Sequence, residues 1–388
     1  MISIIFDFLH HYFLTLGNVT TMNKENSLGR PVRVAIMGLG AQGTNHLRAI
    51  HSLGRELAEI TGLCDMRADR LVDAKLSWPE AATSEDYREI LASGDLDLVI
   101  IATMPNTHAE IAIGAMEAGA SVLCEKPFAM CLSEAEKVFA VANSTGKQLQ
   151  LGTNMRYMPE CQYLHKLVDS GDVGKTVSCK SWGRHLTPPV WGPHYRRELS
   201  GGGVLASTLV HALDLSLWVG GSLNPVAVSA FAGQLFPGKR GAKSDEAVLK
   251  AYNAEDLMYA FVRFDTGAVY TLEGNWCDDR IDAHGFELIT EKATLRNSPL
   301  EVMVDEDGEV VDRTPSVNDL VESLSRENNH EKFLENWSDS IRRQDEDVIR
   351  HLISGKPWTM QDERQLLNLQ RVIDGCYESA KAGHEVEV

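Results

Sequence analysis

Residues 32–43 read VRVAIMGLGAQG, a short, mostly apolar run followed by a segment with glycines at positions 38, 40 and 43. A segment with helical spacing follows, so the glycines would lie between a strand and a helix. Glycine allows a tight turn there and lets the backbone approach a pyrophosphate, while the N–H groups of the helix N-terminus point at that group. The stretch therefore predicts a dinucleotide-binding turn. Its expected cofactor-binding residues are Gly38, Gly40, Ala41, Gln42 and Gly43.

Strand-like apolar runs and helix-like segments alternate from residue 31 to residue 153. This alternation predicts an α/β Rossmann-type domain with a doubly wound parallel sheet. In residues 154–388 the strand-like runs follow one another, which predicts an α+β domain for substrate binding and oligomerisation, with an open antiparallel sheet of about six strands. Helices are expected near 204–219 and 330–383. The expected strands of this domain are 176–184, 225–233, 258–264, 267–276, 285–290 and 293–297.

Length and composition support this organisation. The chain has 388 residues, which at about 100–200 residues per domain corresponds to two domains. Its 44% hydrophobic and 24% charged residues are typical of a globular protein rather than a disordered or membrane chain. A net charge of −18 repels phosphate backbones and anionic headgroups, so neither nucleic acid nor a membrane is an expected partner. Seven scattered cysteines without a C-x-x-C pair predict reduced thiols, a cytoplasmic location and no metal site.

Residues 1–30 are expected to form an N-terminal extension. Residues 1–21 are apolar enough to resemble a signal peptide, but they lack a basic region, carry Asp7 within the apolar stretch and have no clear cleavage site. An upstream extension is therefore favoured over an export signal. An ordered arm on a partner subunit is the third alternative.

Asp65 ends the second expected strand, 22 residues after Gly43. A carboxylate at this point accepts hydrogen bonds from the adenosine ribose hydroxyls and repels the 2′-phosphate of NADP, which favours NAD. Arg67 can pair with that phosphate, so NADP stays an alternative. A solvated surface charge is the simpler interpretation of Arg67.

Glu125-Lys126-Pro127 follows the strand-like run 120–124, at the carboxyl edge of the sheet where ligands bind in this architecture. The proline restricts Lys126 to an extended conformation, so its ammonium is aimed rather than free. Beside a nicotinamide, this ammonium can hydrogen-bond a substrate hydroxyl and stabilise negative charge that develops on its oxygen.

These features together resemble the glucose-fructose oxidoreductase and inositol dehydrogenase family (Gfo/Idh/MocA), over about residues 32–380. The order of the EKP sequence and the later G-G-G…H-x-x-D sequence is specific to this resemblance. The matching stretches are GLGAQGTNH (38–46, with His46), TMPNTHAE (103–110), AGASVLCEKP (118–127), NMRY (154–157), SGGG (200–203) and HALD (211–214).

The resemblance implies hydride transfer between NAD(P) and a carbon that bears a hydroxyl, usually on a sugar or cyclitol. Lys126 and His211 would then be the catalytic residues. The further cofactor-binding residues are expected to be Thr103, Met104, Asn106, His108, Glu125 and Lys126. The residues expected to contact the substrate are Lys126, Asn154, Arg156, Tyr157, His185, Trp191, Ser207, His211 and Asp214.

His211 also fits an acid/base role from its own context. It lies in an apolar, helix-like segment after a glycine-rich entry, and an imidazole exchanges a proton near neutral pH. The chain departs from the family pattern at Ser207, where similar proteins often carry Asp, and at Met104, which replaces a common proline. Asp214, at i+3 from His211, can orient the imidazole or serve as a cap or core residue. These departures leave the substrate and the proton path open.

Aromatic and polar residues near the triple glycine suit a hydroxylated, partly apolar ring such as a sugar. Several of them are expected to be packing residues. The candidates are Trp182, His185, Trp191, His194, Tyr195, Arg196, Arg197, Asn275 and Trp276.

The sequence therefore predicts an NAD(P)-dependent dehydrogenase that acts on a secondary alcohol of a sugar, glycoside or cyclitol. One alternative is a redox-neutral lyase or glycosidase that oxidises a sugar carbon transiently with bound NAD. Another is a non-catalytic, dinucleotide-bound regulator. An uncovered sheet face is usually buried by another subunit, so a homodimer or homotetramer is expected.

Overall fold

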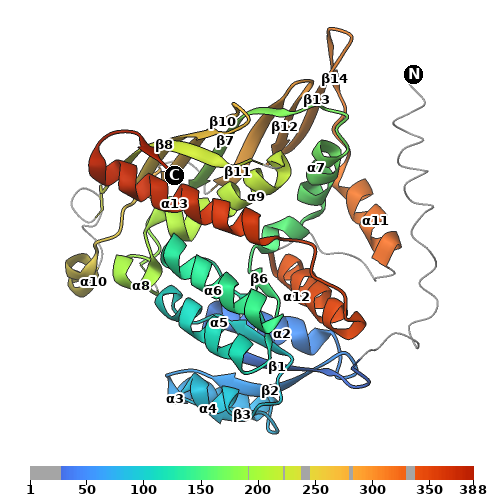
Figure 1. The fold of residues 1–388 in the computed structure, drawn as a ribbon, viewed down its shortest axis with the longest axis vertical. Helices are drawn as coiled ribbons and strands as arrows, with labels where there is room; N and C mark the ends of the chain where they lie inside the picture. The colour runs from blue at the N-terminus through green and yellow to red at the C-terminus, as the bar shows by residue number, and fades with distance from the viewer. Residues whose placement is uncertain (1–27, 191, 222, 237–244, 279–282, 329–336) are drawn as a thin grey trace.

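The computed structural model describes residues 28–190, 192–221, 223–236, 245–278, 283–328 and 337–388. The expectations about the first 27 residues and about Trp191 lie outside these residues. Two sheets form the two ends of the molecule, and helices fill the space between them (Figure 1).

The first sheet is parallel, with six strands in the order β3-β2-β1-β4-β5-β6, which confirms the Rossmann-type prediction. The runs LVII and SVLC, which form β4 and β5, are buried throughout, as strands covered on both faces should be. The strands are β1 (Val32–Met37), β2 (Ala58–Cys64), β3 (Ala82–Ser84), β4 (Leu98–Ile101), β5 (Ser121–Cys124) and β6 (Leu149–Leu151). Its helical segments are α2 (Ala41–Ser52), α3 (Ala68–Ser77), α4 (Tyr87–Leu91), η1 (Pro105–Thr107), α5 (His108–Glu117) and α6 (Leu132–Thr145).

The second sheet has nine strands in the order β14-β13-β12-β11-β7-β10-β9-β8-β15, which confirms the predicted α+β domain with a mostly antiparallel sheet and corrects the expectation of about six antiparallel strands in two respects. First, β7 and β10 run parallel in the middle of the sheet. Second, a hairpin and a short C-terminal strand extend its two edges. The strands are β7 (Thr176–Arg184), β8 (Pro225–Gly233), β9 (Leu257–Phe264), β10 (Val269–Asn275), β11 (Ala283–Thr290), β12 (Ala293–Asn297), β13 (Leu300–Glu306), β14 (Glu309–Asp312) and β15 (Val386–Glu387).

The added hairpin joins β13 to β14 through Asp307 and Gly308, which have φ values of +57° and +90°. Aspartate followed by glycine is a typical hairpin turn, because both positions need positive φ. Charged residues interrupt the short apolar stretches of both strands, which explains why the pattern of apolar runs missed the hairpin.

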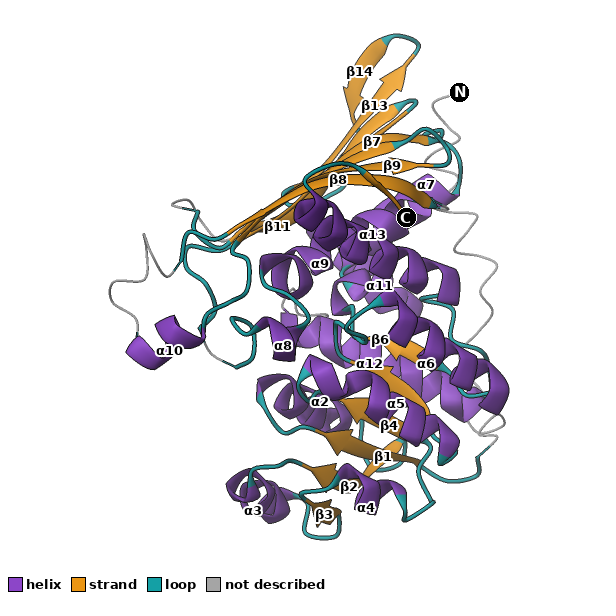
Figure 2. Ribbon diagram, turned by 60° about the vertical axis from the view of Figure 1, so that its left-hand side comes forward, coloured by secondary structure: helices purple, strands orange, loops and turns teal. Residues whose placement is uncertain are grey.

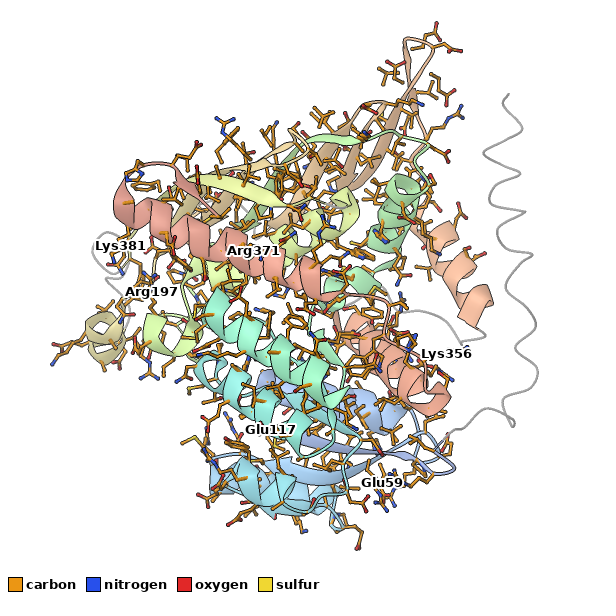
Figure 3. The ribbon with its side chains drawn as sticks, viewed as in Figure 1. Glu59, Glu117, Arg197, Lys356, Arg371 and Lys381 are labelled. Atoms are coloured by element: carbon orange, nitrogen blue, oxygen red, sulfur yellow. The ribbon has the colours of Figure 1, made fainter. Side chains whose placement is uncertain are left out.

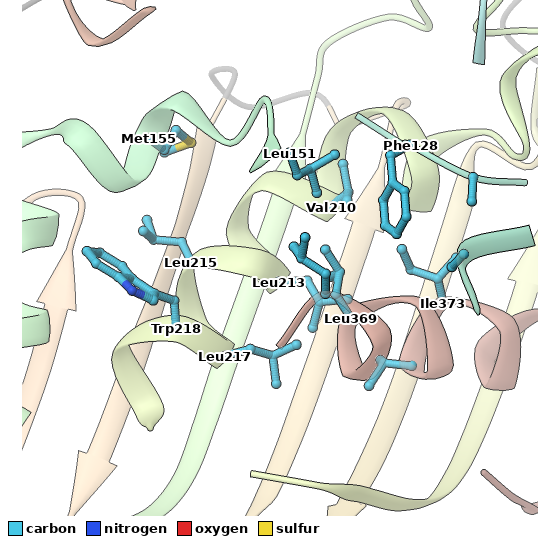
Figure 4. Packing of buried hydrophobic residues seen from close by; sticks show 14 of the residues in the cluster. Phe128, Leu151, Met155, Val210, Leu213, Leu215, Leu217, Trp218, Leu369 and Ile373 are labelled. Atoms are coloured by element: carbon cyan, nitrogen blue, oxygen red, sulfur yellow. The ribbon is translucent and has the colours of Figure 1, made fainter. Parts of the chain in front are cut away.

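The helix expected at 204–219 is confirmed with one change. A π-helical turn, η3 (Leu205–Leu209), precedes α9 (Val210–Gly220), and every residue of α9 is buried. Figure 4 shows Val210, Leu213 and Leu217 of this segment packed toward Leu369 and Ile373. The helical stretch Arg197–Gly220 is long and apolar enough to span a membrane by composition, but 94% of its most apolar window is buried inside the structure, as in the core helix of a globular domain.

Three helices lie in the C-terminal part of the described chain, namely α11 (Val317–Asn328), α12 (Trp337–Ser354) and α13 (Glu363–Ala382). Two of them, α12 and α13, correspond to the region expected at 330–383, of which residues 330–336 lie outside the described part, whereas α11 precedes that region and was not predicted. Below, the parallel sheet with its helices is called the first unit, and the nine-stranded sheet with its helices the second unit. Of the three helices, α13 packs on β8, whereas α12 returns to the first unit and packs against α2 (Figure 1). The remaining helical segments of the second unit are η2 (Asn154–Tyr157), α7 (Pro159–Asp169), α8 (Arg197–Ser200) and α10 (Glu246–Ala251).

The described helices cover only one face of the second sheet (Figure 2). On the other face Phe231 pairs with Tyr259, and 59% and 43% of these two side chains are exposed. Charged side chains such as Glu117 and Lys356 lie on the outside of the molecule (Figure 3). The expectation of an open sheet face therefore agrees with the structure.

Candidate active site

The glycine turn after β1 is as tight as its spacing predicts. Gly38 has φ +93°, and a Cβ on it would lie 2.4 Å from the carbonyl oxygen of Ala102. A Cβ on Gly43 would lie 1.8 Å from the carbonyl oxygen of Gly38. Gly40 stands immediately before α2, so the N–H groups of the first helical turn, which have no partner within the helix, lie beside this turn. The turn fits a pyrophosphate.

Asp65 is buried at the end of β2 and faces this turn. Its Oδ2 accepts hydrogen bonds from the backbone N–H of Leu39 at 2.7 Å and from the guanidinium of Arg70 at 3.0 Å. The guanidinium of Arg67 pairs with Asp69 instead and is exposed. Arg70 is therefore the cation beside the expected ribose site. Arg70 was not among the predicted site residues, although its place in the first turn of α3, five residues after Asp65, is a signal for it.

The run after β4 lies at the carboxyl edge of the same sheet. Met104 and Asn106 are exposed there. His108 is buried, with Nδ1 2.8 Å from the carbonyl oxygen of Pro127 and Nε2 3.2 Å from that of Thr103. Both ring nitrogens of His108 thus contact protein carbonyls, so this histidine joins two loops of the site and a direct cofactor contact is not supported.

Lys126 reaches from the first unit into the second. Its Nζ donates a 2.7 Å hydrogen bond to the carbonyl oxygen of Ser207, and burial lowers the pKa of the ammonium. The peptide bond between Lys126 and Pro127 is cis. This contact brings together the two segments that the sequence analysis assigned to catalysis.

The backbone that receives Lys126 is the π-helical turn η3. In a π turn the hydrogen bonds span five residues rather than four, which leaves room for a side chain to reach a carbonyl of the helix. The carbonyl of Ser207 accepts the ammonium in this position. Single π turns occur frequently at functional sites, and this one stands directly before α9, which carries His211 as its second residue.

Close packing explains the glycines in front of this turn. A Cβ on Gly203 would lie 1.9 Å from the carbonyl oxygen of Glu255, and one on Gly202 would lie 1.7 Å from the hydroxyl of Tyr377. The buried carboxylate of Glu255 accepts hydrogen bonds from the N–H groups of Gly203 at 2.8 Å and Leu205 at 3.1 Å. Glu255, which the sequence analysis missed, therefore anchors the segment that carries His211.

His211 stands among other imidazoles. Its ring centroid lies 6.4 Å from that of His284, which in turn lies 5.1 Å from that of His185. Burial, followed by the charge of Lys126, lowers the pKa of His211 well below its ordinary value. The imidazole of His211 is thus neutral at pH 7 and able to accept a proton. His284 was missed; it lies on β11, on the face that the helices cover.

His194 occupies the space beside Ser207. Its Nδ1 lies 3.1 Å from the hydroxyl oxygen of Ser207, and burial, Lys126 and His185 lower the pKa of His194 to about 4. Ser207 therefore contacts Lys126 through its carbonyl and His194 through its hydroxyl. The imidazole of His194 thus lies beside Ser207, the position at which the family resemblance leads one to expect a carboxylate.

Asp214 does not orient His211 through its carboxylate, because both of its oxygens are held by Arg156. The guanidinium of Arg156 donates to Oδ1 at 2.6 Å and to Oδ2 at 2.9 Å, and both side chains are at least 98% buried. Arg156 also donates to the carbonyl oxygen of Met360 at 2.8 Å. The pair belongs to the protein core, which is the alternative role weighed for Asp214, and a substrate contact is not supported for either residue.

Asn154 and Tyr157 likewise lie where η2 contacts α12, a contact called below the joint between the units, rather than in an open site. Asn154 donates to the hydroxyl of Ser340 at 2.7 Å, and the hydroxyl of Tyr157 donates to Asp347 at 2.8 Å. Both partners lie on α12. The stretch NMRY (154–157), which resembles the family pattern, therefore has a structural role in this joint.

Most of the aromatic candidates pack against the protein. Trp182 lies beside the guanidinium groups of Arg184 and Arg296, and Trp276 is fully buried and donates to the hydroxyl of Thr208 at 2.8 Å. Their side chains support the sheet and η3 rather than line the site. The others pack similarly: Tyr195 on Tyr252, Arg196 on Tyr195, Arg197 on Tyr377, and Asn275 on the backbone of Cys277.

The fold and this arrangement define the class of two-domain proteins in which a Rossmann unit binds NAD. A family model described as "Oxidoreductase family, NAD-binding Rossmann fold" matches residues 32–153, and the GFO/IDH/MocA C-terminal domain matches residues 161–296. The chain belongs to the Gfo/Idh/MocA oxidoreductase family, as the sequence analysis inferred.

Several characterised proteins are similar to this chain. D-glucoside 3-dehydrogenase of Escherichia coli (strain K12) is 26% identical over 369 residues, which is 94% of this chain and 100% of that protein. Inositol 2-dehydrogenase of Gluconacetobacter diazotrophicus is 30% identical over 188 residues, 48% of this chain and 53% of that protein. The structure of levoglucosan dehydrogenase in complex with NADH has a TM-score of 0.79 at 20% identity, with 92% of this chain and 99% of that chain covered, which supports the fold.

Proposed function

We propose that this protein is an NAD-dependent dehydrogenase that oxidises a secondary alcohol of a sugar, glycoside or cyclitol. The observation that carries the proposal is the hydrogen bond from Lys126 of the first unit to Ser207 of the second, four residues before His211. The names of the similar proteins, a glucoside 3-dehydrogenase and an inositol 2-dehydrogenase, support the substrate class.

The two catalytic residues divide the proton chemistry. The neutral imidazole of His211 accepts the proton of the substrate hydroxyl. The ammonium of Lys126 holds the oxygen and stabilises the negative charge that develops on it. The charge of Lys126 also helps to keep His211 unprotonated before the reaction, because it lowers the pKa of that imidazole.

The residues present fit NAD. The turn around Gly38 and Gly43 would hold the pyrophosphate and Asp65 the adenosine ribose, while Glu125 and Lys126 would face the nicotinamide end. When bound, NAD supplies the acceptor for the hydride that leaves the alcohol carbon. The protein aims the alcohol and removes its proton.

A direct assay tests the proposal. The purified protein is incubated with NAD and, in turn, methyl glucosides, levoglucosan and myo-inositol, and NADH is followed by its absorbance. Steady formation of NADH with at least one of them is expected, and the Lys126→Met variant serves as the control for background reduction. Conversion of a sugar without net NADH would instead identify a redox-neutral lyase or glycosidase.

Asp65 sets the cofactor preference. Asp65→Ser removes the carboxylate that would accept from the ribose and frees Arg70, so NAD affinity is expected to fall on the order of tenfold while NADP binding strengthens. Arg70→Ala in the Asp65→Ser background should cancel the gain for NADP. The matched change Arg67→Ala should not cancel it, because Arg67 pairs with Asp69. Calorimetry measures each affinity, and tighter binding of NADP than of NAD by the unmodified protein would refute this role of Asp65.

The open sheet face supports a homodimer or homotetramer. Phe231→Glu places a charge on that face, where Phe231 and Tyr259 are exposed, and is expected to shift the assembly toward the 42.9 kDa monomer in sedimentation at micromolar concentration. Leu76→Glu, on an exposed side chain of the first unit, is the control and should leave the assembly intact. A monomeric unmodified protein would contradict the proposal.

The cysteines support a cytoplasmic location. All seven are free thiols, and six of them are buried. Unpaired cysteines are typical of proteins in reducing compartments. We therefore propose that the protein works in the cytoplasm, which fractionation of cells that express the full chain would test.

A further inference from the structure

Three buried ionisable side chains form a line inside the first unit. His46, on α2, lies between two carboxylates: its Nδ1 is 2.9 Å from both oxygens of Asp345, and its Nε2 is 3.2 Å from Oε1 of Glu125. His46 and Asp345 are fully buried and Glu125 is 94% buried. Neither the glycine turn nor the chemistry assigned to Lys126 explains why three such groups are placed together.

Charge balance accounts for the central histidine. Although burial disfavours its charged form, the two carboxylates, Asp345 first, raise the pKa of His46 to about 10. His46 is therefore an imidazolium at pH 7, and both of its ring nitrogens donate. The same contact lowers the pKa of Glu125 against the effect of burial, so Glu125 stays ionised. Buried charges of this kind are costly unless each has its partner.

The line ends at the catalytic lysine. Glu125 directly precedes Lys126, and its Oε2 accepts from the backbone N–H of Lys126 at 3.3 Å. Oε1 of Glu125 also accepts from the side chain of Gln42 in the glycine turn at 3.3 Å. A Cβ on Gly152 would lie 3.0 Å from the Glu125 carboxyl, which shows how closely that carboxyl is enclosed. Glu125 thus contacts the segments proposed to hold the pyrophosphate and the nicotinamide end of the cofactor.

The other end of the line lies on α12, far away in sequence. Asp345 is 299 residues from His46. The same helix holds the joint between the units, because Ser340 binds Asn154 and Asp347 binds Tyr157. One helix therefore contacts both the joint and the support of Glu125.

We propose that Asp345 and His46 are positioning residues that hold Glu125, and through it the backbone of Lys126, in the geometry needed for hydride transfer. The inference rests on the proposed function for its kinetic part. Asp345 fixes the ring of His46, His46 fixes one oxygen of Glu125, and the other oxygen of Glu125 fixes Lys126. Neither Asp345 nor His46 touches the substrate.

The test uses Asp345→Asn and His46→Gln in the full chain, with Asp347→Asn as the matched control on the same helix. Each single variant is expected to lower kcat by about 10–100-fold, because small displacements of reacting groups are costly. The KM for the alcohol and the Kd for NADH should stay within about threefold. The fluorescence emission of bound NADH should change in Asp345→Asn and in His46→Gln. In Asp347→Asn neither kcat nor this emission should change.

A double variant shows whether Asp345 and His46 act on Glu125 through one chain of contacts, called here a relay, or affect the rate independently. If the two residues act in one line, Asp345→Asn combined with His46→Gln should lower kcat no more than the stronger single variant. Additive losses, or variants that melt at lower temperature but keep normal kcat and normal NADH emission, would overturn the proposal. Should Asp345→Asn fail to fold, Glu125→Gln, which keeps the shape of the side chain, is expected to reproduce the loss in kcat and the change in emission. The emission of bound NADH requires no turnover, so it tests the relay even if the proposed oxidation fails.

Discussion

Replacing Lys126 with methionine is expected to lower kcat by on the order of 10²–10⁴, while the Kd for NAD stays within about threefold. Methionine preserves much of the unbranched stem but removes the ammonium that binds the Ser207 carbonyl and would hold the substrate oxygen. Loss of charge stabilisation in a buried site affects the transition state more than it affects binding. Initial rates of NADH formation, with the alcohol that the unmodified protein oxidises fastest, and a fluorescence titration measure the two quantities.

The pH dependence of the residual activity of this variant is a second, independent measurement. The charge of Lys126 is one of the causes that hold the pKa of His211 below its ordinary value of 6.5. Removal of that charge raises the pKa of His211, so the acidic limb of the pH profile of kcat/KM should move to higher pH. Lys137→Met, at an exposed position of α6, is the matched control and should change neither the rate nor the profile. A Lys126→Met enzyme with near-normal kcat would rule out the proposed role of Lys126.

Parts of the site that depend on local backbone could be predicted from the sequence. The glycine turn, Asp65 at the end of β2 and Lys126 after β5 each follow a strand directly, and the carboxyl ends of parallel strands meet at one edge. The order of strands and helices in the first unit was readable for the same reason. Short-range rules were sufficient there.

Side-chain partners from distant segments could not be predicted. Asp214 faces Arg156 rather than His211, although i+3 spacing on a helix allows both arrangements. Asp345 meets His46 only because α12 folds back onto α2, and no periodicity in the sequence indicates that return. The orientation of Trp182 depended on which face of β7 the helices cover. In each case tertiary packing determines the partner of the side chain, and the sequence alone does not distinguish between the possible partners.

The second sheet illustrates the same limit. Its apolar runs were identified, but the parallel pairing of β7 with β10 depends on how the segments between them cross the sheet. The hairpin β13–β14, whose short apolar stretches are interrupted by charged residues, carried its clearest signal in Asp307-Gly308. Strand identity was thus easier to predict than strand order.

Replacing His211 with asparagine should lower kcat by on the order of 10²–10⁴ and leave NADH binding within about threefold. In the unmodified protein, burial and then the charge of Lys126 keep the pKa of His211 well below 6.5. Because oxidation needs the neutral imidazole, kcat/KM should be flat from about pH 6.5 to 8 and fall only at lower pH. In His211→Asn this acidic limb should disappear, since no imidazole remains to be protonated there. His51→Gln, at an exposed position of α2, is the control and should keep both the rate and the limb. If His211→Asn retains the limb at reduced rate, another group accepts the proton, and His194, 3.1 Å from the Ser207 hydroxyl, becomes the residue to replace next.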